Sequence, residues 1–294
     1  MLAKELEYRL HHLCIYDDKP RESMMPYLRW HHAITNFFSG AVFHVTGEGH
    51  SDYTFMAAGG HAYQIQIEAP PFQFEYERQW WADHGRGYNH VCWLTSNAEA
   101  SMKQLLANGA TEVMPFEKFP TYDGFVVKDP EGKWIEIMEY THDTFQVNEL
   151  MHAPSGECGL EMIGNAEICE DVEAMTTWYC DVMGMNVLTQ FKDEKDHVVI
   201  LSDDDYRKTD RRSLLVLQNA RTAFQKEHKS AHGNYISAIL YQAKDVDRAW
   251  EDALWAGFTE QHAPHIDPLT GLKTAYLKEP CGGNIVQLTE HFAP

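Results

Sequence analysis

The sequence lacks the features that would assign this protein to a membrane. Its 294 residues contain no apolar run of the ~18 residues that a membrane-spanning helix needs. The first seven residues include two glutamates and no apolar core, so they are unlike a signal peptide. We therefore expect a cytoplasmic protein without a membrane partner.

Basic residues are also in short supply. The chain has 24 Lys and Arg residues against 44 Asp and Glu residues, and its formal net charge is −20. Nucleic acids and anionic membrane surfaces are bound through basic surfaces. This balance argues against both and favours a small-molecule substrate.

No two of the six cysteines form a C-x-x-C pair. Several lie in apolar strand-like or helical segments, where a free thiol behaves as a small buried apolar group. We therefore expect free thiols and no disulfide framework. With 44% hydrophobic and 23% charged residues, the composition is that of a folded protein with about two domains.

The sequence does contain an internal repeat. Segment 87–140 reads as a strand, a helix and three further strands with a D-P-E-G turn before the last, and segment 233–289 repeats this order. The region from 163 and, less regularly, the start of the chain follow the same plan. Four βαβββ modules predict an α+β fold with two domains, 1–153 and 154–294, divided near Ala153 and Pro154.

Two of the repeated opening strands carry a histidine near their start, His12 and His90. The last strand of the first module carries Gln66 and Glu68, and the last strand of the second carries Glu136. Because residues i and i+2 of a strand share a face, each histidine can share a cavity with the oxygen ligand of its own module. Two imidazoles with one or two oxygen ligands form a site for a divalent metal that keeps open positions.

Three motifs make the chain similar to the vicinal oxygen chelate superfamily, which includes glyoxalase I, methylmalonyl-CoA epimerase and extradiol dioxygenases. They are G-R-G-Y-N-H-V-C-W at 85–93, D-P-E-G-K-W-I-E-I at 129–137 and W-Y-C-D-V-M-G-M at 178–185. The resemblance covers nearly the whole chain and implies one divalent metal, either Fe, Ni, Co, Mn or Zn, in a cup formed by two modules.

By position, the resemblance implies the metal ligands His12, Gln66, His90 and Glu136. His11 replaces His12 if the register of the first strand slips by one residue, and Glu68 can replace Gln66. In the C-terminal half, Ala238 and Gln287 stand where a ligand histidine and the closing glutamate belong. The resemblance therefore implies a metal-free C-terminal domain.

Three functions remain open. A glyoxalase- or epimerase-type isomerase or lyase would use Glu68 as the base that moves a proton beside a metal-bound carbonyl. An Fe(II) extradiol-type dioxygenase would need only His12, His90 and Glu136. The third is a protein that binds a small molecule without turnover. The domains can pair within one chain or in a homodimer.

Two further expectations concern side chains outside this set. The aromatic residues between 72 and 81 are more typical of packing between modules than of a substrate lid. Glu131 and Glu139 look like solvated positions.

Overall fold

The computed structural model describes residues 6–19, 22–23, 25–27, 29–30, 52–57, 64–72, 74–119, 122–140, 160–203, 213–232, 235–280 and 283–291. No helix in these ranges is long and apolar enough to cross a membrane. The predicted domain boundary at 153–154 lies outside them.

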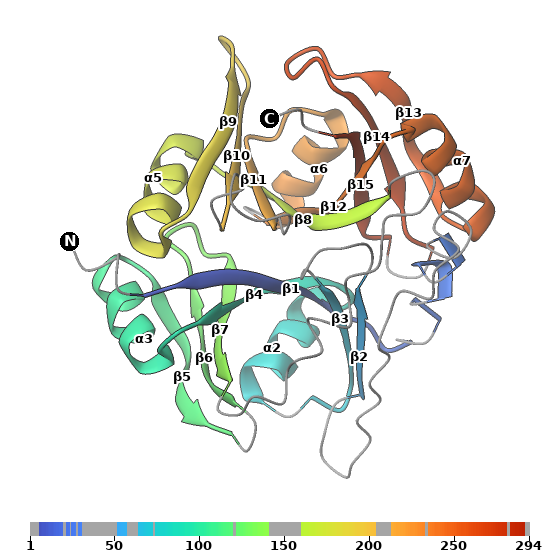
Figure 1. The fold of residues 1–294 in the computed structure, drawn as a ribbon. Coiled ribbons are helices and arrows are strands. Elements are labelled where there is room, and N and C mark those ends of the chain that lie inside the picture. The colour runs from blue at the N-terminus through green and yellow to red at the C-terminus, as the bar shows by residue number, and fades with distance from the viewer. Residues whose placement is uncertain are drawn as a thin grey trace. The chain divides into compact units, whose positions relative to one another are not determined.

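The described strands form two sheets (Figure 1). The first sheet contains β1 (Tyr8–Tyr16), β2 (Asp52–Ala57), β3 (Gln64–Ala69), β4 (Gly87–Thr95), β5 (Thr111–Lys118), β6 (Tyr122–Lys128) and β7 (Trp134–Tyr140), in the order β2-β3-β1-β4-β7-β6-β5. The second contains β8 (Glu161–Ile168), β9 (Asn186–Lys192), β10 (His197–Ser202), β11 (Leu214–Gln218), β12 (Ile236–Ala243), β13 (Thr259–Ile266), β14 (Lys273–Lys278) and β15 (Ile285–Glu290), in the order β13-β14-β15-β12-β8-β11-β10-β9.

The pairing within the sheets follows the predicted module. In the second module β4 runs parallel to β7, whereas β5, β6 and β7 are antiparallel neighbours. The fourth module repeats this with β12 parallel to β15 and an antiparallel β13-β14-β15. In the first module, β1 is parallel to β3, and β2 is antiparallel to β3. In the third module, β9, β10 and β11 are antiparallel neighbours. The predicted α+β class with repeated βαβββ modules is confirmed.

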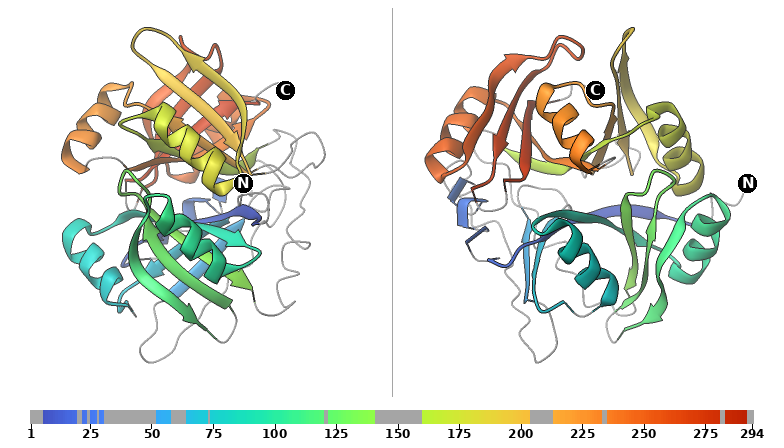
Figure 2. Two further views of the ribbon diagram at one scale, coloured as in Figure 1. Left: turned by 90° about the vertical axis from the view of Figure 1, so that its left-hand side faces the viewer. Right: turned by 180° about the vertical axis from the view of Figure 1, so that it is seen from behind.

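The helices begin and end where the sequence supplies capping residues. The helices α3 (Ala98–Ala107), α5 (Val172–Met183) and α7 (Val246–Ala256) follow Asn97, Asp171 and Asp245, whose side chains accept backbone N–H groups of the first turn. Gly184 and Gly257 end α5 and α7 in the left-handed conformation. The helix α3 packs on β5, β6 and β7, α5 on β10 and β11, and α7 on β13, β14 and β15 (Figure 1 and Figure 2).

The chain divides into two compact units. One comprises Met1–His11, His90–Val147 and Asn165–Ser237, and the other comprises His12–Asn89, Asn148–Gly164 and Ala238–Pro294. Each compact unit therefore holds one module from either half of the chain. Each sheet, in contrast, holds two consecutive modules. The predicted domain ranges, 1–153 and 154–294, stay a prediction.

Three of the aromatic residues between 72 and 81 pack around the end of β1. The ring of Phe72 stacks on Tyr16 at 4.5 Å between centroids, and Trp80, in α2 (Glu75–His84), meets Tyr16 edge-on at 5.1 Å. Trp81 and Cys14 belong to the same cluster. These rings pack on a strand of the first module, and packing between modules stays a prediction.

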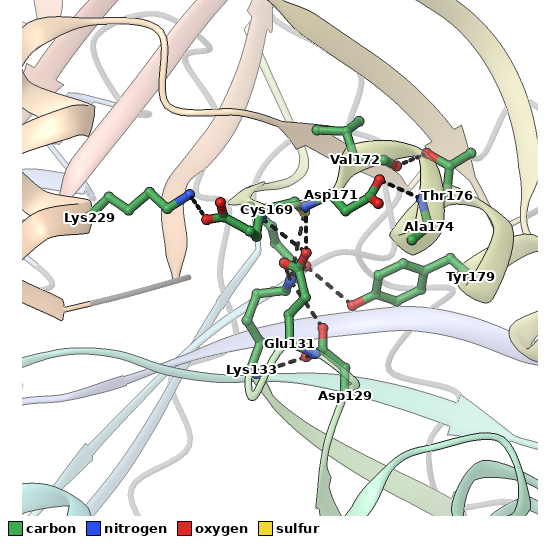
Figure 3. Close-up of polar contacts among 12 residues, drawn as sticks. Asp129, Glu131, Lys133, Cys169, Asp171, Val172, Ala174, Thr176, Tyr179 and Lys229 are labelled. Atoms are coloured by element: carbon green, nitrogen blue, oxygen red, sulfur yellow. Dashed lines mark hydrogen bonds and ion pairs between the residues drawn. The ribbon is translucent and has the colours of Figure 1, made fainter.

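The turn before β7 is fixed by a buried ion cluster (Figure 3). The Lys133 side chain is 2% exposed, and its Nζ lies 3.1 Å from Asp129 Oδ2, 3.2 Å from Glu131 Oε2 and 3.7 Å from Glu167 Oε2. Burial by itself would lower the pKa of Lys133, but the carboxylates of Glu167 and Asp129 outweigh it and raise that pKa. The lysine is therefore a cation that joins the β6–β7 turn to β8.

Glu131 and Glu139 are half-buried and bind helix N-termini, so the expectation that they are simply solvated holds only in part. Glu131 Oε1 accepts the backbone N–H groups of Glu170 and Asp171 at the start of α5, at 3.0 and 2.8 Å. Glu139 Oε2 accepts the N–H of Ala98 at the start of α3, at 2.8 Å. A carboxylate suits a helix N-terminus because the first N–H groups have no partner within the helix.

Candidate metal centre

The strands β4 and β7 bring His90 and Glu136 together. They are parallel, with His90 opposite Trp134 and Cys92 opposite Glu136. Side chains in register on parallel strands share a face, and His90 and Cys92 are two residues apart, so His90, Cys92 and Glu136 lie on one face. His90 Nε2 is 3.4 Å from Glu136 Oε2, and their side chains are 3% and 14% exposed.

The electrostatics around Glu136 keep it ionised. Burial alone would raise the pKa of Glu136, but the hydrogen bond to His90 and its charge outweigh this, and the pKa is lowered. Burial lowers the pKa of His11 to about 4, against the opposing effect of Glu136, so His11 is neutral near pH 7. Burial, with the charge of Glu136, raises the pKa of Cys92. The centre thus holds a carboxylate, a neutral imidazole and a neutral thiol.

The first module repeats this register with other side chains. On the parallel strands β1 and β3, Cys14 lies opposite Gln66 and Tyr16 opposite Glu68. Cys14 follows His12 by two residues, as Cys92 follows His90. The register therefore places Gln66, and not Glu68, at the position in its module that Glu136 occupies in the second.

The amide of Gln66 is oriented by a neighbour on the same strand. Gln66 Nε2 donates a hydrogen bond to Glu68 Oε1 at 2.7 Å, and both residues are buried. Gln66 Oε1 is buried and has no hydrogen-bond partner among the described residues. In the sequence, the only sign of this hydrogen bond is the spacing of two residues, which predicts a shared face and no more.

The predicted ligands belong to two compact units. His90 and Glu136 lie in the unit that contains His90–Val147, whereas His12 and Gln66 lie in the unit that contains His12–Asn89. Within the first unit, His90 Nε2 and Glu136 Oε2 are close enough to serve one ion. The set of four ligands, and the choice between His12 and His11, stay predictions.

The thiol of Cys92 was not among the predicted site residues. The signal for it was present, since a cysteine follows each of the two histidines by two residues and must share its face. Interpreting all the cysteines as buried apolar groups hid this position.

The C-terminal half shows the same register without the predicted ligand types. Leu240 lies opposite Gln287 on the parallel strands β12 and β15, so Ala238 and Gln287 occupy the positions of His90 and Glu136 in that module. Alanine has no donor atom in its side chain. The metal-free C-terminal domain stays a prediction.

The family comparison gives the class of the fold. Residues 166–288 match the model of the Glyoxalase/Bleomycin resistance protein/Dioxygenase superfamily. The C-terminal half therefore carries a domain of this superfamily, and the resemblance predicted from the motifs is confirmed. No curated protein sequence matches the chain.

Solved structures extend the likeness in fold to nearly the whole chain. The 2,2',3-trihydroxybiphenyl 1,2-dioxygenase of Sphingomonas wittichii RW1 is 12% identical with a TM-score of 0.58, over 97% of this chain and 91% of the other. The Mn(II)-bound glyoxalase of Novosphingobium aromaticivorans is 12% identical with a TM-score of 0.57, over 97% and 81%. The 2,3-dioxygenase LapB of Pseudomonas sp. KL28 is 11% identical with a TM-score of 0.59, over 97% and 92%.

Proposed function

We propose that this protein is a metal-dependent vicinal oxygen chelate enzyme of the isomerase or lyase type. Its ligands would be His12, Gln66, His90 and Glu136, and its substrate a small molecule with two neighbouring oxygens. The observation that carries the proposal is the shared register, in which Gln66 and Glu136 stand at equivalent places beside the two histidine strands.

The donor set fits a divalent metal. Two imidazoles with carboxylate and amide oxygens suit the ions of the first transition row. Gln66 Oε1 supports the fit, because a buried carbonyl oxygen without a hydrogen bond is costly unless a ligand satisfies it. The lowered pKa of Glu136 supports it as well, since a ligand carboxylate must be ionised.

The metal would supply a Lewis acid that binds the two substrate oxygens and stabilises the negative charge developing on them. A side chain of the protein would have to move the substrate proton. Glu68 is our candidate for the base, because it is a buried carboxylate on the same strand face as Gln66.

An extradiol-type dioxygenase is the second candidate. His12, His90 and Glu136, as predicted from the sequence, would by themselves make the two-histidine, one-carboxylate set that suits Fe(II). Two of the structures with a similar fold, those from Sphingomonas and Pseudomonas, are dioxygenases by name. The cytoplasmic location and the homodimer remain predictions from the sequence.

The test is reconstitution of the purified protein without oxygen, separately with Fe(II), Mn(II), Ni(II), Co(II) and Zn(II). Each form is then assayed for exchange of substrate protons with deuterated water and for oxygen uptake, using small hydroxy-carbonyl compounds and catechols. Proton exchange supports the proposal. Substrate-dependent oxygen uptake by the Fe(II) form decides for the dioxygenase, and a failure to bind any metal leaves the non-catalytic binding protein.

Once a substrate is found, Glu68→Gln tests the base. Losing a general base should lower turnover by roughly 10²-fold or more while the metal stays bound. Turnover close to that of the wild type would remove Glu68 from this role.

A further inference from the structure

The two polar atoms of the Gln66 amide stand in different environments. Nε2 donates to Glu68 Oε1 at 2.7 Å, whereas Oε1 is buried and has no hydrogen-bond partner among the described residues. Gln66 as a whole is 6% exposed. A ligand at Oε1 is what would complete this side chain.

Glu68 decides which way the amide faces. An ionised carboxylate only accepts hydrogen bonds, so it attracts the NH₂ end of an amide and repels the carbonyl end. In the flipped amide, Gln66 Oε1 would lie where Nε2 now lies, 2.7 Å from a carboxylate oxygen. With Glu68 in place, Nε2 points to Glu68, and Oε1 is turned away from it.

The second module differs at the corresponding position. Leu94 lies opposite Met138 on β4 and β7, as Tyr16 lies opposite Glu68 on β1 and β3. The residue two positions after Glu136 is thus an apolar methionine. The difference has a chemical reason: the two oxygens of a carboxylate are equivalent, so Glu136 binds a cation in either orientation, whereas an amide presents an oxygen in only one.

We propose that Glu68 is a positioning residue, whose carboxylate holds the Gln66 amide so that Oε1 faces a divalent cation. The inference rests on the proposed function, because it takes Gln66 as one of the ligands. It is separate from the role of Glu68 as a base, because positioning needs only a hydrogen-bond acceptor at Oε1, whereas proton transfer needs an ionisable group.

The experiment measures Mn(II) affinity of the full-length protein, with free Mn(II) followed by electron paramagnetic resonance. Glu68→Met should weaken Mn(II) binding by about 10- to 100-fold, the usual effect of removing a group that orients a metal ligand. Glu68→Gln should stay near the wild type, because its own amide oxygen can still accept the N–H of Gln66. Exposed Glu260 on β13 supplies the matched control Glu260→Met, which should leave the affinity unchanged.

The decisive variant is the double substitution Gln66→Glu with Glu68→Met. This variant gives the first module the same pair of side chains as Glu136 and Met138 in the second. Because the two oxygens of a carboxylate are equivalent, its ligand does not need a neighbouring group to orient it. The double variant should regain the Mn(II) affinity that Glu68→Met loses. If Glu68 had only a structural role, the change at Gln66 would not restore this affinity. If Glu68→Met does not fold, Glu68→Asp, whose carboxylate is one methylene shorter, should weaken binding for the same reason.

The outcomes separate this inference from the proposed function. Normal Mn(II) affinity in folded Glu68→Met or Glu68→Asp, with binding still lost in Gln66→Ala, would overturn the positioning role and leave the metal site intact. Normal Mn(II) affinity in Gln66→Ala would show that Gln66 is not a ligand, and this would overturn the inference. Failure of the wild type to bind any divalent metal would overturn the proposed function itself.

Discussion

At the scale of single residues, the proposed metal centre depends on which donor atoms stand close together. His90 Nε2 and Glu136 Oε2 are 3.4 Å apart, and both residues come from strands whose register is defined. A buried histidine beside a half-buried carboxylate is also compatible with a purely structural pair. Metal binding by variants distinguishes the two interpretations.

His90→Ala should abolish stoichiometric metal binding while the protein stays folded, because one of the two imidazoles of the proposed site is lost. Metal content after reconstitution and the far-ultraviolet circular dichroism spectrum measure the two effects. His84→Ala, at the exposed end of α2, is the matched control and should keep its metal. Full occupancy in His90→Ala would refute the assignment.

At the scale of elements, one turn and two helix ends hold the strand β7. Glu131 and Glu139, on either side of Glu136, each accept N–H groups at the start of a helix. Lys133 joins the β6–β7 turn to Glu167 on β8. The position of β7 is therefore fixed at both ends by buried or half-buried carboxylates and one cation.

Lys133→Met should destabilise the protein by roughly 3–5 kcal/mol, the usual cost of removing one partner from a buried ion pair. The methionine fills most of the volume but leaves the carboxylates of Asp129 and Glu167 without their cation. Urea unfolding followed by tryptophan fluorescence measures the effect. Lys103→Met, on the exposed face of α3, should change stability little. An equally small effect at Lys133 would show that the cluster contributes nothing to stability.

Glu167 should make stability depend on pH. Burial, partly offset by Lys133 and reinforced by Asp129, raises the pKa of Glu167 from 4.5 to about 7. The folded state thus binds this proton more tightly than the unfolded state. The contribution to stability is complete below pH 4.5 and is lost as the pH rises through about 7.

The neutral variant Glu167→Gln lacks this titration, and its amide can still bond to Tyr179 and Asn165. Between pH 5 and pH 8 the wild type should therefore lose roughly 2–3 kcal/mol relative to the variant, since a tenfold change in proton affinity corresponds to about 1.4 kcal/mol. Urea unfolding of both proteins across this range measures the difference. Parallel pH profiles would show that Glu167 does not titrate there.

At the scale of the whole molecule, only two of the four similar modules carry the predicted ligands. The described residues of the second sheet repeat the register of the first, with Ala238 and Gln287 in the ligand positions. The repeated fold therefore does not by itself make a repeated site.

The protein should accordingly bind one divalent metal per chain. Metal analysis after dialysis measures the ratio, and the combined substitution His12→Ala and His90→Ala should bring it to zero. A second tight equivalent that survives this substitution would place a site between residues 160 and 290 and would show that the module alignment is wrong.

The sequence by itself determined the module order and the class of fold, because strand periodicity, capping residues and turn motifs are local signals. It also predicted His90 and Glu136, which lie in motifs, and His12 from its spacing. Local signals do not state which side chains meet across elements. The tertiary structure decided the pairing of Gln66 with Glu68, the ion cluster at Lys133 and the helix-capping roles of Glu131 and Glu139, because each requires segments brought together, or side chains turned toward each other, by folding.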